Sequence, residues 1–447
     1  MSELAIRGAT ILTVAPGLTT SEATVEGDVV VDGGRIVAIG PGEGSDAEEQ
    51  IDARGCIVVP GFVQAHVHLC QTLFRGLADD QDVIDWLRER VWPLERGHDA
   101  ASMRASCELG IAELLLGGTT SVLSMESIAH TSESYAAAER MGLRATIGKA
   151  LMDRWEPGTE MVGESTDDAW DDQVALMERW HGAGDGRVRV ALSPRGPRNA
   201  TPEMWRRCVE LADRADLRLH THVDENHDQA ERFAATDEGR DVVALESWGA
   251  LGERLVMAHC VWLDDQEREL VRRRRPHVCH CPSANLKLAS GIAPIPELLA
   301  DGVNVALGAD GAACNNRLDQ FEEMRLAALV HKPRCGPRSM PAGTVLEMAT
   351  MGGARALGLQ DEVGSIEVGK LADLVVVDPS GPHVRPVPGT APEVRLVYGA
   401  RAGDVRDVFV AGRPVVRDRH LMTADLAAVV AEADAQRTAL LGRVPLT

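Results

Sequence analysis

The sequence predicts an α/β protein: a (β/α)₈ TIM barrel with a small β-sandwich domain built from both ends of the chain. Short apolar runs alternate with amphipathic helical stretches through the middle, strand-rich segments flank that middle, and histidines or carboxylates follow four of the apolar runs. Alternating strand and helix patterns are typical of βα units with a parallel sheet. We expect the sandwich in residues 1–59 and 363–447, the latter with a C-terminal helix, and the barrel in residues 60–362.

Both ends of the chain have the pattern of strands joined by tight turns. The Asp-Gly-Gly at 32–34 separates two β-branched runs, which is a strong hairpin signal. Similar runs return at 364–378 and 405–416. Because these regions flank a long middle, we expect them to meet in one small domain. The tail from about Ala424 to Leu441 predicts one amphipathic helix.

The middle of the chain contains eight candidate strands, and most of them are followed by a helical pattern. Eight βα units fit a (β/α)₈ barrel, whose active site lies at the C-terminal ends of the strands. The alternative is an open doubly wound sheet, but no Gly-x-Gly-x-x-Gly motif follows an early strand. The candidate strands are Phe62 to His66, Thr120 to Ser124, Arg144 to Ala150, Arg187 to Ser193, Arg218 to His222, Leu255 to His259, Val278 to Cys281 and Val303 to Leu307.

The composition is ordinary for a soluble globular protein, with 45% hydrophobic and 26% charged residues in a chain of 447. The formal net charge of -22, from 68 acidic and 46 basic residues, argues against a nucleic-acid or acidic-membrane partner. The nine cysteines lack the spacing of a disulfide framework, and neither a secretory signal nor a membrane-spanning run is evident. We therefore expect a cytoplasmic protein with reduced thiols.

Candidate metal ligands stand at the ends of the predicted strands. His66 and His68 are one residue apart after an apolar run, so on a strand they project from the same face. His222 and Asp310 end the fifth and eighth predicted strands. These residues supply three nitrogens and one oxygen, which suits zinc, or alternatively ferrous iron, with one position open for water. The sequence therefore predicts a site for a divalent metal.

Two further residues near these ligands are candidates for proton handling. A divalent ion lowers the pKa of water to about 7 and so provides hydroxide. We expect Glu225 to shuttle a proton, and His259 to hold the hydroxide and stabilise charge in the tetrahedral intermediate. By strand period, His220 shares a face with His222, so the period alone leaves the ligand undecided. We expect His222, because it is nearer the strand end and Glu225 follows it closely.

These motifs together resemble the metal-dependent amidohydrolase superfamily, and within it the cytosine-deaminase-like branch of triazine chlorohydrolases and deaminases of adenosine-type compounds and guanine. The resemblance covers nearly the whole chain. No lysine ends the fourth predicted strand, where some two-metal members carry a carboxylated one, so the resemblance implies a single metal. Besides the β-rich flanks, the motifs that carry it are residues 60–68, His222 with Glu225, 258–260, 281–288 and 308–316.

The resemblance also implies roles for individual residues. It implies a small heterocyclic substrate and, because members of the branch are often homodimers or larger, a homo-oligomer. The metal ligands that it implies are His66, His68, His222 and Asp310, and the catalytic residues are Glu225, His259 and Asp310, with Asp310 also accepting the proton of the water.

Substrate contacts are expected from three places. The stretch from Arg75 to Glu95, which contains Trp86, resembles the substrate-covering segment of adenosine-type deaminases, in which Glu95 looks like a partner of ribose hydroxyls. A solvated helix-end carboxylate is the alternative for Glu95. Arg195 ends the fourth strand, where adenosine-type relatives usually place a histidine and guanine deaminases are similar in having arginine. Its planar guanidinium suits a ring carbonyl or carboxylate. Lys149, ending the third strand, is a candidate second cation.

Surface salt bridges are the alternative for Arg195 and Lys149, and the expectation for Arg198. A structural zinc at 279–281 lacks a fourth ligand, so we expect buried thiols there.

We therefore expect hydrolytic deamination of an amino-substituted nitrogen heterocycle of purine, pterin, pyrimidine or triazine type, with an oxygen facing Arg195. The alternatives are a triazine chlorohydrolase or alkylaminohydrolase, an adenosine-type deaminase acting on 5'-deoxyadenosine or S-adenosylhomocysteine, and a catalytically inert scaffold on the same fold. The intact metal set and Glu225 argue against the scaffold.

Overall fold

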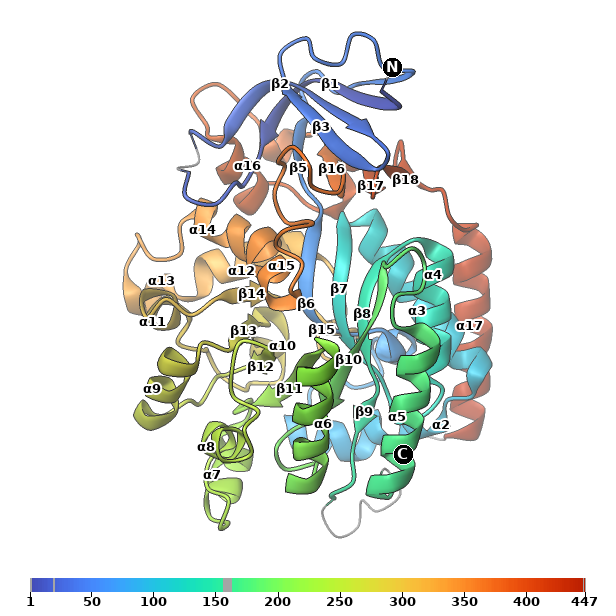
Figure 1. The fold of residues 1–447 in the computed structure, drawn as a ribbon, viewed down its shortest axis with the longest axis vertical. Helices are drawn as coiled ribbons and strands as arrows, with labels where there is room; N and C mark the ends of the chain where they lie inside the picture. Colours follow the sequence, from blue (N-terminus) through green and yellow to red (C-terminus); the bar gives the residue numbers. More distant parts are fainter. Residues whose placement is uncertain (1, 19–20, 156–162, 445, 447) are drawn as a thin grey trace.

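A curled parallel sheet surrounded by helices forms the centre of the molecule (Figure 1). The structure is a computed structural model that describes residues 2–18, 21–155, 163–444 and 446. The last strand of the sheet pairs with β6, so the sheet curls back to its first strand, and the predicted TIM-barrel-like α/β fold is confirmed. In order, the neighbouring strands are β14 (Val305–Leu307), β13 (His277–His280), β12 (Leu255–His259), β11 (Arg218–Val223), β10 (Val188–Pro194), β8 (Arg144–Gly148), β7 (Thr119–Met125), β6 (Phe62–His68) and β15 (Asp310–Gly311), with β9 (Ala150–Leu151) beside β10.

Helices follow the strands and cover the outside of this sheet (Figure 1). In α6, Thr201 caps the N-terminus by accepting a hydrogen bond from the Met204 backbone, and the buried Met204, Cys208 and Leu211 recur at helical spacing. The helices are η1 (Leu69–Phe74), α1 (Val83–Trp86), η2 (Leu87–Val91), α2 (Trp92–Gly97), α3 (Ala100–Leu116), α4 (Thr131–Met141), α5 (Thr166–Trp180), α6 (Pro202–Ala215), α7 (His227–Ala234), α8 (Asp241–Ser247), α9 (Asp265–Arg274), α10 (Pro282–Lys287), α11 (Ile295–Ala300), α12 (Gln320–Val330), α13 (Lys332–Cys335), α14 (Ala342–Glu347), η4 (Met348–Gly352), α15 (Gly353–Leu357), η5 (Pro382–Val384), α16 (Pro392–Tyr398), η6 (Ala402–Asp404) and α17 (Leu426–Arg443).

The eighth strand position is interrupted, which the sequence did not indicate. After β14, the chain passes Gly308 and Ala309 and then pairs as β15 with β6. A Cβ on Gly308 would lie 2.5 Å from the carbonyl oxygen of His66, so only glycine allows this approach. Gln64 of β6 accepts a hydrogen bond from the Ala309 backbone at 3.0 Å. These contacts fix where Asp310 begins β15.

A second sheet takes strands from both ends of the chain and lies above the barrel in Figure 1. Strand β5 continues into β6 of the barrel and pairs antiparallel with β16, which joins the N-terminal and C-terminal segments. The predicted hairpin at 32–34 connects β2 and β3. The strands of this second sheet run in the order β19 (His420–Leu421), β18 (Arg413–Arg417), β17 (Val405–Val410), β16 (Leu374–Val377), β5 (Ile57–Pro60), β1 (Leu4–Leu12), β2 (Thr24–Asp32) and β3 (Arg35–Gly40), with β4 (Glu49–Asp52) beside β1.

The C-terminal helix α17 packs against α3 of the barrel. It matches the helix predicted from about Ala424 to Leu441. Within the described residues, no helix has the length and apolar character that crossing a membrane requires.

A buried ion pair joins the barrel to the second sheet. The Arg144 guanidinium donates from Nε and from an NH2 group to the two oxygens of Asp373, each at 3.0 Å. The side chains are 4% and 1% exposed. Asp373 also accepts a hydrogen bond from the Ala411 backbone, and its own carbonyl accepts one from Gly61. Each buried charge therefore has an opposite charge as its partner at the junction of the two sheets.

Replacing Arg144 with methionine should lower the free energy of unfolding by about 3–5 kcal/mol, because the Asp373 charge stays buried without its partner. Urea denaturation measures the loss. The matched control is Arg254→Met, whose partner Asp213 is 66% exposed and whose loss should cost about 1 kcal/mol or less. An equal loss of unfolding free energy in both variants would show that the buried pair stabilises the fold no more than an exposed pair does.

Candidate active site

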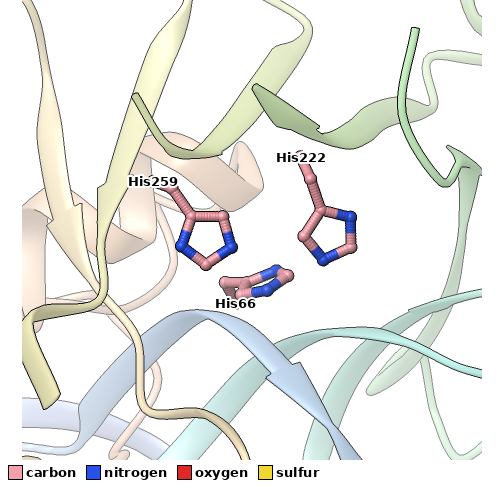
Figure 2. A group of neighbouring side chains, drawn as sticks. All are labelled: His66, His222 and His259. Atoms are coloured by element: carbon pink, nitrogen blue, oxygen red, sulfur yellow. The ribbon is translucent and has the colours of Figure 1, made fainter. Parts of the chain in front are cut away.

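The ends of four barrel strands bring histidines and an aspartate together. His66 and His68 come from β6, His222 from β11, His259 from β12 and Asp310 from β15. Figure 2 shows the imidazoles of His66, His222 and His259 gathered from three strands around one centre. The ligand atoms of these three lie within 4.8 Å of one another, and the same holds for His66, His68 and Asp310. The structure thus brings all the predicted metal ligands to one place.

The separations between donor atoms fit a single small cation. Asp310 Oδ1 lies 3.2 Å from the Nε2 atoms of both His66 and His68, and His222 Nε2 lies 3.3 Å from His68 Nε2. Two ligands on a tetrahedral zinc, with bonds of about 2.0–2.2 Å, stand about 3.3–3.6 Å apart. His66 Nε2 and His259 Nε2 are buried and have no hydrogen-bond partner in the part of the chain that is described. The residues present therefore fit a divalent metal.

Each of these imidazoles is oriented through its outer nitrogen. Nδ1 of His68 hydrogen-bonds the Met125 carbonyl and Nδ1 of His222 the Arg195 carbonyl, both at 2.6 Å. Nδ1 of His66 lies 2.8 Å from His220 Nε2. Such outer contacts fix the tautomer and ring orientation of metal-binding histidines. His220 thus lies one layer deeper, behind His66, and does not belong to the metal-ligand groups of the described residues.

Left-handed backbone conformations surround the centre. Four of the non-glycine residues with positive φ, between 44° and 75°, lie at this site: Asp224, His259, Cys260 and Asp310. The Asp224 carbonyl accepts hydrogen bonds from the backbones of residues 261 and 262, so the ends of β11 and β12 hold each other. Such backbone strain persists only where surrounding structure fixes it, and it clusters at active sites.

Burial sets the protonation of this group. It lowers the pKa of His66 to about 4 and holds that of His222 well below its usual range, so both imidazoles are in the neutral form that binds metals. Burial raises the pKa of Glu225; His259 opposes this and the charge of Asp310 reinforces it. The carboxyl of Glu225 lies 3.7 Å from His259 Nε2, within reach of a shared reactant.

A cavity opens directly over these residues. Trp86 lines it from the predicted covering segment, which forms α1, η2 and α2. The residues around the cavity are His68, Gln71, Ile84, Trp86, Leu87, Arg88, Trp92, Met152, Trp155, Arg195, Gly196, Arg198, Asn199, His222, Glu225, Gln229, His259 and Asp310.

Arg195 and Glu95 form a buried ion pair beside the cavity. Arg195 NH1 donates to Glu95 Oε2 at 2.6 Å and NH2 donates to Oε1 at 3.2 Å. Gln71 also donates to Oε1, at 2.9 Å. Burial acts to raise the pKa of Glu95, but Arg195 and Gln71 outweigh it, so the pKa lies below its ordinary value. Arg195 faces the cavity, whereas Glu95 stands behind it with both oxygens occupied.

Lys149 is engaged elsewhere. Its ammonium donates to the Ile128 carbonyl, to Glu164 and to Asp172 at 2.5, 2.9 and 2.7 Å. The structure does not bring it to the wall of the cavity, as far as the described residues form that wall. These three acceptors hold the Lys149 ammonium away from the cavity.

Comparison with known proteins decides the family. The sequence model of the Amidohydrolase family matches residues 57–415. This chain belongs to the amidohydrolase family. A 5-methylthioadenosine/S-adenosylhomocysteine deaminase of Syntrophobacter fumaroxidans is 42% identical over 89% of this chain and 90% of its own. A 5'-deoxyadenosine deaminase of Methanosarcina acetivorans is 37% identical over 99% of each.

Solved structures share the fold of this amidohydrolase. An adenosine deaminase from Xanthomonas campestris with bound zinc superposes with a TM-score of 0.91, at 33% identity over 99% of both chains. An atrazine chlorohydrolase from Arthrobacter aurescens, complexed with zinc, gives 0.89 at 27% identity over 97% of this chain and 100% of the other.

Sequence reasoning missed a supporting residue of the amidohydrolase site. Asn285 of α10 accepts, through Oδ1, a hydrogen bond from His259 Nδ1 at 2.9 Å. Asn285 lies in the 281–288 motif, which the sequence analysis singled out without assigning a role to this residue. The neighbouring Cys279 and Cys281 are buried free thiols, as expected. Within the described residues, neither cysteine belongs to a group that could hold a metal.

Metal analysis distinguishes the two histidines of β11. His222→Asn should lower the bound metal well below one ion per chain, because it removes a donor that faces the centre. His220→Asn should keep about one ion per chain with about 10–100-fold weaker affinity, as for loss of an outer partner. Inductively coupled plasma mass spectrometry measures both. Loss of the metal in His220→Asn alone would reverse the assignment.

Proposed function

We propose that this amidohydrolase is a metal-dependent hydrolytic deaminase of an amino-substituted nitrogen heterocycle, with adenosine-type compounds as the first substrate class. It is a hydrolase acting on C–N bonds other than peptide bonds. The observation that carries the proposal is the set of buried ligand atoms beside Glu225 and His259, open to one cavity. The names of the relatives that are 42% and 37% identical support the adenosine-type class.

The proposed metal is zinc, held by His66, His68, His222 and Asp310; ferrous iron is the alternative. When bound, such an ion supplies hydroxide at neutral pH by lowering the pKa of water to about 7. Zinc in the Xanthomonas structure supports this choice.

The chain's own residues then handle the protons. Asp310 takes a proton from the attacking water. His259, whose Nε2 lies 3.9 Å from Asp310 Oδ2 and 3.7 Å from Glu225 Oε2, stabilises the oxygen that adds to the amino-bearing carbon. Glu225, whose pKa burial raises, protonates the adjacent ring nitrogen. Asp310 then passes the water's first proton to the amino group, so that ammonia leaves. The proton of the remaining hydroxyl returns to Glu225, and the ring keeps a carbonyl oxygen.

The Arg195–Glu95 pair favours a second substrate class. In an adenosine-type substrate, ribose hydroxyls would have to reach Glu95, which already accepts three hydrogen bonds from Arg195 and Gln71 and lies behind the cavity wall. A ring or substituent oxygen could instead accept from Arg195 without breaking the pair. An s-triazine chlorohydrolase remains the alternative reaction, supported by the fold shared with the atrazine enzyme. Chloride release, measured beside ammonia release, separates the two reactions.

The proposal also covers the domain division, the cellular compartment and the oligomeric state. Residues 1–59 and 363–447 would form a β-sandwich around the barrel of 60–362, and the antiparallel pairing of β5 with β16 supports this division. We propose a cytoplasmic homo-oligomer whose partner is a small heterocyclic substrate.

Glu225→Gln should lower kcat for ammonia release by about 10²–10⁴, because the amide cannot transfer the proton. The bound metal should stay near one ion per chain. Ammonia is assayed with a panel of purines, pterins, pyrimidines and triazines. Glu203→Gln, in an exposed pair with Arg207, is the control and should match the wild type. Undiminished turnover in Glu225→Gln would remove Glu225 from the reaction.

Arg195→His should shift the preference towards adenosine-type substrates, because it removes the fork of donors and frees Glu95 for hydroxyls. The measured quantity is the ratio of kcat/KM for adenosine to kcat/KM for guanine. We expect this ratio to rise at least about tenfold, the value of one hydrogen bond to a charged group. An unchanged ratio would show that Arg195 does not select the ring.

A further inference from the structure

Arg198 lines the cavity beside the catalytic residues, although it was expected in a surface salt bridge. Among the residues that the structure describes, Arg198 forms no such salt bridge. Its NH1 atom is buried and lacks a hydrogen-bond partner in the same part of the chain. A buried guanidinium nitrogen without an acceptor is costly, and because Arg198 lines the cavity, a molecule bound there can supply that acceptor.

The turn that carries Arg198 is held in place next to the metal ligands. The carbonyl oxygen of Arg195 accepts hydrogen bonds from both the backbone and the ring of His222, at 3.2 and 2.6 Å. Asn199 donates from its backbone to the Gly196 carbonyl, and its own carbonyl accepts from Arg154. The turn after β10 is therefore fixed to the end of β11, three residues before Glu225. Arg198 approaches the cavity from a preorganised position.

Arg195 and Arg198 differ in their partners inside the protein. NH1 and NH2 of Arg195 each donate a hydrogen bond to Glu95, whereas NH1 of Arg198 has no acceptor among the described residues. The acidic residues in the cavity wall are Glu225 and Asp310, which belong to the proton and metal machinery. Arg198 thus keeps a donor for an incoming molecule.

We infer that Arg198 is a specificity-determining residue that binds an oxygen acceptor on the substrate. The inference rests on the proposed deaminase function and names a feature of its substrate. A guanidinium binds a carboxylate or carbonyl oxygen with charge-assisted hydrogen bonds. The oxygen belongs either to the heterocyclic ring or to a carboxylate on its substituent, and the experiment separates these two sources.

Three aminopurine nucleosides test the inference. 5'-Methylthioadenosine carries neither oxygen, S-adenosylhomocysteine carries a substituent carboxylate, and isoguanosine carries a ring oxygen. In Arg198→Met, the ratio of kcat/KM for the acceptor-bearing compound to that for 5'-methylthioadenosine should fall about 10–100-fold. A fall for S-adenosylhomocysteine alone identifies the carboxylate, and a fall for isoguanosine alone identifies the ring oxygen.

Matched variants separate binding from folding. Arg207→Met removes an arginine whose partners Asp167 and Glu203 lie on the surface, and its ratios should equal those of the wild type. Arg198→Lys keeps a charged donor and should recover part of the lost ratio. If Arg198→Met does not fold, the comparison of Arg198→Lys and Arg198→Gln with the wild type replaces it, with the larger fall expected in Arg198→Gln.

The two proposals fail in different ways. If the protein releases ammonia from none of the heterocycles, the proposed deaminase function is wrong. Calorimetric binding of the three nucleosides to the metal-loaded protein then decides the role of Arg198. Unchanged ratios, or equal losses for all three nucleosides in kcat/KM or in binding, would overturn the inference.

Discussion

The site depends on one constraint: imidazole nitrogens and a carboxylate from distant strands are buried facing one another. Two histidine Nε2 atoms stand 3.2 Å from the same Asp310 oxygen, and a third histidine is 3.3 Å from one of them. Of these atoms, His66 Nε2 is buried without a hydrogen-bond partner among the described residues, which is expensive. A divalent cation at their centre satisfies all of them together, and so the arrangement makes sense as a metal centre.

The rest of the fold keeps these atoms in register. Outer hydrogen bonds orient each imidazole, and left-handed residues turn the chain at the ends of β11, β12 and β15. Gly308 and Gln64 bring the eighth strand position against β6, so Asp310 faces His66 and His68. The barrel supplies strand ends at one edge, and these local contacts convert that edge into a site of defined geometry.

Much of this could be predicted from the sequence, and the reason is local. Strand ends follow from apolar runs, so a histidine at such an end is placed by pattern alone, as with His66, His68 and His222. Contacts between distant residues carry no such signal. Arg195 and Glu95 are a hundred residues apart in sequence, and their pairing is visible only in the fold. Lys149 ends a strand as predicted, yet acceptors on nearby segments hold it away from the cavity.

The central claim is that the strand-end residues bind one cation directly. Anomalous X-ray diffraction at the zinc edge, from crystals of the zinc-loaded protein, tests it most directly. The account predicts a single peak about 2.0–2.2 Å from Nε2 of His66, His68 and His222 and from a carboxylate oxygen of Asp310. A peak bound elsewhere, or none at these residues, would contradict it.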